Sequence, residues 1–127
     1  MNQTDAQHWP ARWASERFIY LTTRGRRSGR PHRIEIWFAA ERGRLYMLAG
    51  SGERADWVRN VRAAPRVMVE LGSETHVGVA HVLAPQTPED QRARELLVAK
   101  YADPEDDLEE WGRTALPVVI EFPSEGT

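Results

Sequence analysis

The chain contains no cysteine among its 127 residues. It therefore has no disulfide frame, no thiolate metal site, no iron–sulfur cluster and no thiol nucleophile. Long apolar runs are also missing, and no segment approaches the roughly 18 residues that a membrane-spanning helix needs. The first five residues, Met1–Asp5, lack the basic and apolar regions of a signal peptide. We therefore expect a cytoplasmic protein without a transmembrane segment.

Lysine is almost absent, since Lys100 is the only lysine among the 17 basic residues. The charges are also unevenly distributed. Residues 1–66 carry 13 arginines and 6 acids, whereas residues 67–127 carry 4 basic residues and 13 acids. This excess of arginine suggests an anionic ligand for the first half, because a guanidinium can hold phosphate through two hydrogen bonds. A solvated basic surface is the plainer alternative.

The hydrophobic pattern predicts a single α+β domain. A length of 127 residues with 41% apolar content is sufficient for one core. Consecutive hairpins favour an antiparallel sheet or barrel of about six strands, with three or four helices, over a doubly wound fold. The predicted strands span residues 18–23, 33–38, 45–49, 67–71, 75–83 and 116–122. The predicted helices span residues 5–16, a short segment before Pro65, residues 87–101 and residues 108–113.

Two glycine-bearing loops are the segments best suited to binding. Arg24–Arg30 combines two glycines, which allow a tight turn with converging amides, with arginines and a Ser28 hydroxyl that would complete a phosphate cradle. On the pattern alone, an ordinary arginine-rich hairpin loop explains this segment as well as a phosphate site does. The second loop, Gly50–Arg54, opens the short helix carrying Trp57 and Asn60, where free amides favour an anion. Together the loops predict a ligand with a phosphate and a planar ring.

The remaining candidates give weaker signals. Trp37 lies on a predicted strand, where it faces either the core or a ring-binding cleft, and Trp57 fits the core. No Ser–His–Asp arrangement is legible, and the acidic run at residues 103–110 lacks the calcium-loop pattern. The four histidines show no metal-ligand spacing; they are His8, His32, His76 and His81. We therefore predict no metal site and no catalytic side chain.

One stretch resembles a family signature. Residues 21–31 read Leu-Thr-Thr-Arg-Gly-Arg-Arg-Ser-Gly-Arg-Pro, which is similar to the signature L-T-T-x-G-R-x-S-G-x-P of deazaflavin (coenzyme F420)-dependent nitroreductase and quinone-reductase-like proteins. The resemblance continues through Gly50–Gly52, Asp56-Trp57, Asn60 and Ala64–Val67, and it ends at Arg113–Val118. It covers roughly residues 17–122, in order.

The resemblance implies a split β-barrel like that of the FMN-binding pyridoxamine-phosphate oxidase relatives. By this likeness residues 17–123 form the cofactor-binding barrel, residues 1–16 a helical extension and residues 124–127 a tail. It implies that the cofactor's phosphate or polyglutamate tail is held by Arg26, Arg27, Ser28 and Gly29. The cofactor groove would be lined by Gly50, Ser51, Gly52, Arg54, Trp57 and Asn60, with the ring near His32, Ile34, Ile36 and Trp37.

The substrate side departs from the nitro-activating members. Those members carry several tyrosines after the long helix, whereas here only Tyr101 is present, followed by an alanine and an acidic segment. This difference argues against nitroimidazole activation. It leaves Trp37 and Tyr101 as the predicted substrate-binding residues.

The sequence therefore predicts an F420-dependent reductase that transfers hydride to a small unsaturated or quinone-like acceptor. The cofactor would supply the hydride chemistry and the protein would supply orientation. An FMN-binding oxidoreductase on the same barrel is the nearest alternative, and storage of a cofactor without turnover is another. A nucleic-acid binder is disfavoured by the acidic balance and by the lack of a recognised motif. A homodimer is left open.

Overall fold

The computed structural model describes residues 11–103 and 108–123. The expected N-terminal helix therefore lies mostly outside the described residues, and its described part is α1, Ala11–Ala14. No helix in the described ranges is long and apolar enough to cross a membrane.

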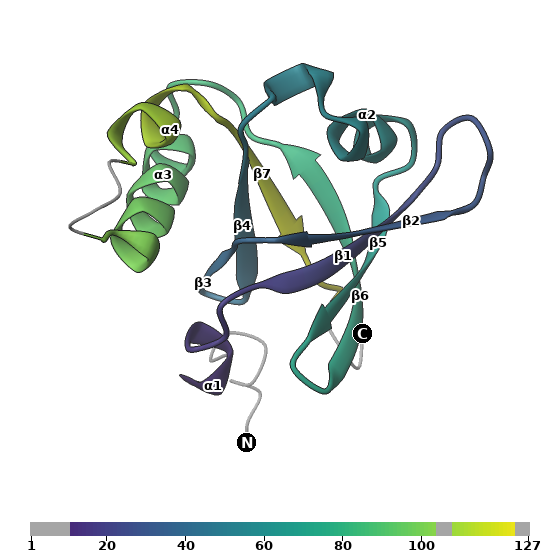
Figure 1. Ribbon diagram of the computed structural model, residues 1–127, viewed down its shortest axis with the longest axis horizontal. Helices are drawn as coiled ribbons and strands as arrows, with labels where there is room; N and C mark the ends of the chain where they lie inside the picture. The colour runs from purple at the N-terminus through teal and green to yellow at the C-terminus, as the bar shows by residue number, and fades with distance from the viewer. Residues whose placement is uncertain (1–10, 104–107, 124–127) are drawn as a thin grey trace.

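A seven-stranded antiparallel sheet forms the body of the molecule. Its strand order is β2-β1-β5-β6-β7-β4-β3, and it curls so that β1 and β2 cross in front of β4 and β7 (Figure 1). The strands are β1 Ile19–Arg24, β2 Pro31–Ile36, β3 Ala39–Glu41, β4 Arg44–Ala49, β5 Arg66–Leu71, β6 Glu74–Val82 and β7 Leu116–Glu121. The prediction of an antiparallel α+β fold is confirmed, with one strand more than expected.

The additional strand is β3. It is three residues long and pairs with β4 through a turn in which Arg42 and Gly43 have φ of 56° and 78°. Such left-handed conformations at both central residues suit the twist of a tight hairpin. The expected strand over residues 33–38 was wrong at both ends, because β2 begins at Pro31 and stops at Ile36. Trp37 therefore lies in the connection to β3 and not on a strand.

Both faces of the sheet carry a core. The inner face closes on itself, and Leu21, Met47 and Val69 are fully buried there. The helix α2, Asp56–Ala63, covers one end of this curl and inserts Val58 and Val61 into it (Figure 1). The outer face is covered on β3, β4 and β7 by α3, Pro88–Tyr101, against which α4, Glu109–Thr114, packs.

The start of α3 follows its sequence signals. The Thr87 hydroxyl accepts a hydrogen bond from the amide of Asp90 at 3.1 Å, and Pro88 occupies the first helical position. The predicted helix over residues 87–101 is thus confirmed, since an N-cap hydroxyl and a first-turn proline both favour this boundary.

The last turn of α3 holds an unusual cation. The Lys100 ammonium lies 3.6 Å from the centre of the Phe38 ring, and its buried Nζ has no hydrogen-bond partner among the described residues. Burial lowers the pKa of Lys100 to about 8; Arg17 adds to the decrease and Glu16 opposes it. The folded protein therefore holds this proton less tightly than the unfolded chain does.

Replacing Lys100 should change how stability depends on pH. Between pH 8 and 10.5 the unfolded chain binds more protons at this position than the native state, so the free energy of unfolding rises with pH there. Lys100→Met removes the unpartnered charge and should raise that free energy by about 1–2 kcal/mol at pH 7, after the lost cation–π contact is subtracted. Urea unfolding at pH 7, 8.5 and 10 measures both effects.

Lys100→Arg, which keeps a charge at all three pH values, is the control. The same pH dependence in the wild type and in Lys100→Met would contradict the assignment of the titration to Lys100.

Candidate functional site

The loop between β1 and β2 is a closed, hydrogen-bonded turn that projects beyond α2 (Figure 1). The amide of Gly25 donates to the carbonyl of Arg30 at 2.8 Å, and the amide of Gly29 donates to the carbonyl of Gly25 at 2.8 Å. A Cβ on Gly25 would lie 2.9 Å from the Ser28 hydroxyl, and Gly29 has φ of 75°. Both positions therefore require glycine. Ser28 Oγ itself accepts from the amide of Arg30 at 3.1 Å.

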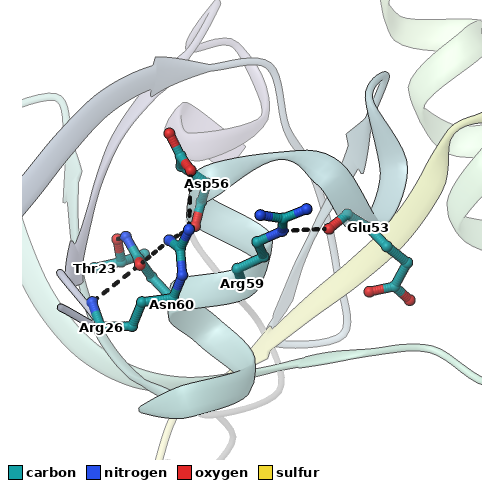
Figure 2. Close-up of polar contacts among 6 residues, drawn as sticks. All are labelled: Thr23, Arg26, Glu53, Asp56, Arg59 and Asn60. Atoms are coloured by element: carbon teal, nitrogen blue, oxygen red, sulfur yellow. Dashed lines mark hydrogen bonds and ion pairs between the residues drawn. The ribbon is translucent and has the colours of Figure 1, made fainter.

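A buried amide fixes this loop to α2. Asn60 Oδ1 accepts from the backbone amide of Arg26 at 3.1 Å and from its Nη1 at 2.9 Å. Asn60 Nδ2 donates to Thr23 Oγ1 at 3.0 Å, and Asp56 forms an ion pair with Arg26 at 3.2 Å. Figure 2 shows Arg26 reaching both α2 side chains. Arg26 and Asn60, both predicted to contact the cofactor, thus hold the loop in place.

Four neighbouring arginines are free for an anion. Among the described residues, no ion pair or side-chain hydrogen bond involves the guanidinium groups of Arg24, Arg27, Arg30 and Arg54, all of which are exposed. Arg33, Arg44, Arg62 and Arg92, by contrast, each pair with a carboxylate. Four unpaired guanidinium groups thus lie on the two glycine-bearing loops, while Arg42, Arg66 and Arg113 are unpaired elsewhere in the described residues.

The second loop is anchored from α2 as well. It includes the short 3₁₀ helix η2, Gly52–Arg54, in which Gly52 has φ of 61° and open space where a Cβ would be. Arg59 Nε donates to the Glu53 carbonyl at 3.2 Å, and Arg62 forms a two-fold contact with the Glu53 carboxylate (Figure 2 shows the Arg59 bond). The Arg62 hydrogen bond lowers the pKa of Glu53. The one acid of this loop is thus neutralised, and Arg54 is left free.

An exposed aromatic surface lies beside the second loop. Trp37 is 39% exposed and stacks on Tyr101 at 4.1 Å with an interplanar angle of 3°. Trp111 meets Trp37 edge-on at 5.7 Å, and its Cδ1 would lie 3.9 Å from a Cβ on Gly50. Trp111 was not among the predicted site residues, because nothing in its local sequence indicates a neighbour 74 positions earlier.

Tyr101, predicted as a substrate contact, is buried and hydrogen-bonded to the backbone. It is 4% exposed, and its hydroxyl accepts from the Phe38 amide at 2.9 Å. The same oxygen lies 2.8 Å from the Arg17 carbonyl and 2.9 Å from the Phe38 carbonyl, so its single proton is shared between two acceptors. Burial raises the pKa of Tyr101. The side chain supports Trp37 by stacking on it, and its role toward a substrate stays a prediction.

The other predicted residues lie at varied depths. Trp57 is 8% exposed and belongs to the inner core, whereas Ile34 and Ile36 pack partly buried against that core. His32 is exposed on β2, next to the arginine loop (residues 24–30), and Ser51 is exposed before η2. Their roles toward a cofactor stay predictions.

A groove of about 880 Å³ runs between α3 and α4. Its walls include Gln91, Val98, Leu108 and Arg113, and none of the predicted site residues lines it.

The model of the F420H(2)-dependent quinone reductase family matches residues 2–123, nearly the whole chain. Several solved structures share the fold. An F420-H2-dependent reductase is 23% identical with a TM-score of 0.69, covering 83% of this chain and 94% of that one. A chain described as a domain-swapped dimer is 23% identical with a TM-score of 0.69, covering 83% of this chain and 80% of that one.

The haem storage protein HutZ from Vibrio cholerae is 13% identical with a TM-score of 0.71, covering 87% of this chain and 84% of that one. At such identities the likeness concerns the fold, and it confirms the predicted split β-barrel. The family match decides the activity class that the fold leaves open. The chain belongs to the F420H(2)-dependent quinone reductase family, oxidoreductases that use coenzyme F420.

Proposed function

We propose that the chain reduces a small quinone-like acceptor, that its two glycine-bearing loops hold reduced coenzyme F420, and that Trp37 forms a wall of the acceptor site. The observation that carries this proposal is the concentration of free guanidinium groups on the loops that flank α2. The second loop also lies near an exposed aromatic surface, since Trp111 contacts Trp37 and its Cδ1 would lie 3.9 Å from a Cβ on Gly50.

The donor set fits the cofactor's chemistry. The tail of F420 carries a phosphate and carboxylates, and guanidinium groups bind both kinds of anion through charge-assisted hydrogen bonds. Four free arginines exceed what a single phosphate, as in FMN, requires. Open space above Gly52 allows close approach of a ligand to the backbone. We assign the tail to Arg27, Arg30 and Arg54, with Arg24 beside them.

The bound cofactor supplies the hydride, so the chain needs to position the reactants and exclude water. Trp37 offers an apolar ring face held in one orientation by Tyr101 and Trp111. The Tyr101 hydroxyl is already shared between main-chain carbonyls, so it is not a proton donor to the acceptor. This arrangement supports binding without an obligatory acid–base side chain.

Removing the free charges should weaken cofactor binding. In the double variant Arg27→Ala, Arg30→Ala, we expect the dissociation constant for F420 to rise about ten- to a hundredfold, because charge-assisted contacts are lost. Fluorescence titration measures it, and FMN titrated in parallel should bind more weakly to the wild type. Arg42→Gly is the matched control, since it removes an exposed charge from a distant turn whose φ of 56° suits glycine. Equal affinity in the double variant and the control would refute the assignment.

Truncating the aromatic wall should affect the acceptor. For Trp37→Ala we expect the KM for menadione to rise about tenfold, because the apolar face is removed. The kcat at saturating menadione and the affinity for F420 should stay within about twofold, and Trp37→Phe should restore most of the KM. The readout is oxidation of reduced F420 by menadione in steady state. An unchanged KM in Trp37→Ala would place the acceptor elsewhere.

We further propose a homodimer formed through the uncovered part of the outer sheet face. Met68, Val77 and Val79 are 41–44% exposed there, and Met68 pairs directly with Val77 across β5 and β6. A continuous apolar surface of this kind favours association. Similarity to a chain described as a domain-swapped dimer supports the proposal.

Sedimentation tests the dimer. The wild type should sediment as a dimer, and Val79→Lys should shift it to the monomer, because a lysine on this face would have to be desolvated. Gln91→Lys, on the exposed side of α3, is the control and should leave the mass unchanged. A wild-type monomer, or a dimer unaffected by Val79→Lys, would rule out this interface.

A further inference from the structure

We propose that Thr23 and Asn60 are positioning residues that set the affinity for the cofactor by closing the base of the arginine loop. This inference rests on the proposed function, and it concerns residues that touch the loop and not the cofactor. Thr23 and Asn60 are 1% and 3% exposed, and they are two of the three buried polar residues among those described. A buried polar side chain is tolerated only where its hydrogen bonds are made.

The contacts form a directed chain. The Arg26 amide and guanidinium donate to Asn60 Oδ1, Asn60 Nδ2 donates to Thr23 Oγ1 at 3.0 Å, and the Thr23 hydroxyl points to the His32 carbonyl at 3.5 Å. Thr23 precedes the loop and His32 follows it, and the two pair across β1 and β2. The chain therefore joins both strands of the loop's stem to α2.

The orientation of the Asn60 amide is determined by these partners. Both lone pairs of Oδ1 face N–H groups of Arg26, which can only donate. A rotated amide would place its own donors against those donors and would leave Thr23 with the oxygen. Asn60 therefore has one arrangement, and the loop has one place on α2.

The hydrogen-bonded chain Arg26–Asn60–Thr23, called the latch below, separates the arginines of the loop into two groups. Arg26 points inward, where Asn60 and Asp56 occupy its guanidinium, and its side chain is 22% exposed. The exposed ion pair with Asp56, whose side chain is 69% exposed, contributes little by itself. With Arg26 held, Arg27 and Arg30 point to solvent. Affinity for an anionic tail then depends on a loop that is ordered before the ligand arrives.

Thr23 offers the cleaner variants. Thr23→Val keeps the volume and the strand propensity but cannot accept from Asn60, and Thr23→Ser restores the hydroxyl. For Thr23→Val we expect about tenfold weaker F420 binding, since the hydroxyl's hydrogen bonds with Asn60 and with the His32 carbonyl are both lost. Thr23→Ser should bind within about twofold of the wild type. The kcat at saturating F420 should be unchanged in both variants. An Asn60→Ala variant provides a second measurement.

Two further readouts distinguish positioning from general damage. Hydrogen exchange of the Gly25 and Gly29 amides, measured without cofactor, should quicken in Thr23→Val and not in Thr23→Ser. In the Arg27→Ala, Arg30→Ala background, Thr23→Val should cost no more than about twofold in affinity, because the arginines that it positions are gone.

The outcomes are separable. Wild-type affinity in Thr23→Val, or the same loss in both backgrounds, would overturn the positioning role. Unchanged exchange of the loop amides in Thr23→Val would overturn the latch itself. If the wild type does not bind F420, the proposed function fails, while the exchange experiment still decides whether Thr23 and Asn60 order the loop.

Discussion

A curled sheet must fill the space inside its own curl, and the rest of this structure depends on that constraint. Side chains of five strands meet in the interior, and α2 covers one end by inserting Val58 and Val61. Because α2 is held there by apolar packing, its polar residues Asp56 and Asn60 have a fixed place at the rim. The arginine loop is attached at this rim. Binding residues on a loop thus inherit their position from a hydrophobic core.

The outer face of the same sheet is covered by a helix on one half and left exposed on the other. The long helix α3 covers β3, β4 and β7, and Tyr101 at its end bonds to the backbone of Phe38 and Arg17. The Tyr101 hydroxyl fixes the position of the β2–β3 connection through these bonds. Trp37, in the same connection, stacks on the Tyr101 ring. On β5 and β6 no described helix covers the face, and apolar residues are exposed there. Enclosure of one half creates the aromatic surface, and exposure of the other half leaves room for a partner.

The uneven charge of the sequence is partly offset by ion pairs between the two halves of the chain. Arginines of the first half pair with acids of the second, as Arg33 does with Glu70 and Arg44 with Glu89 and Glu121. Among the described residues, unpaired arginines include those on the loops at residues 24–30 and 50–54, and also Arg42, Arg66 and Arg113 elsewhere. The sequence asymmetry predicted an anion site in the first half, and the unpaired arginines on the two loops are consistent with that prediction. The asymmetry alone overstates the charge available to a ligand, because Arg26, Arg33, Arg44 and Arg62 of the first half pair with carboxylates.

Most of the fold could be predicted because its signals are local. Alternation located six strands, and Thr87 with Pro88 located the start of α3. The short β3 was missed because three residues are too few to show a hydrophobic alternation. Trp37 was therefore assigned to the preceding strand instead of the connection to β3. The candidate site was predicted as a set of residues. Which of them hold the loop and which stay unpaired depends on contacts across 34 or more positions. Nothing local distinguishes Arg26, bonded to Asn60, from Arg27, which is free.

That division gives a reason why a cofactor-dependent site would need precisely placed residues even where the cofactor carries the reaction. Where the cofactor carries the reaction, the protein acts through the place and order of its binding groups. Exposed guanidinium groups alone would have to be ordered on binding, at a cost in affinity for each flexible side chain. A buried threonine–asparagine pair lowers this cost beforehand, because its hydrogen bonds have no water to exchange with and persist in the free protein. On the proposed role of Thr23 and Asn60, residues that control binding would thus be among the least accessible polar residues in the described part of the chain.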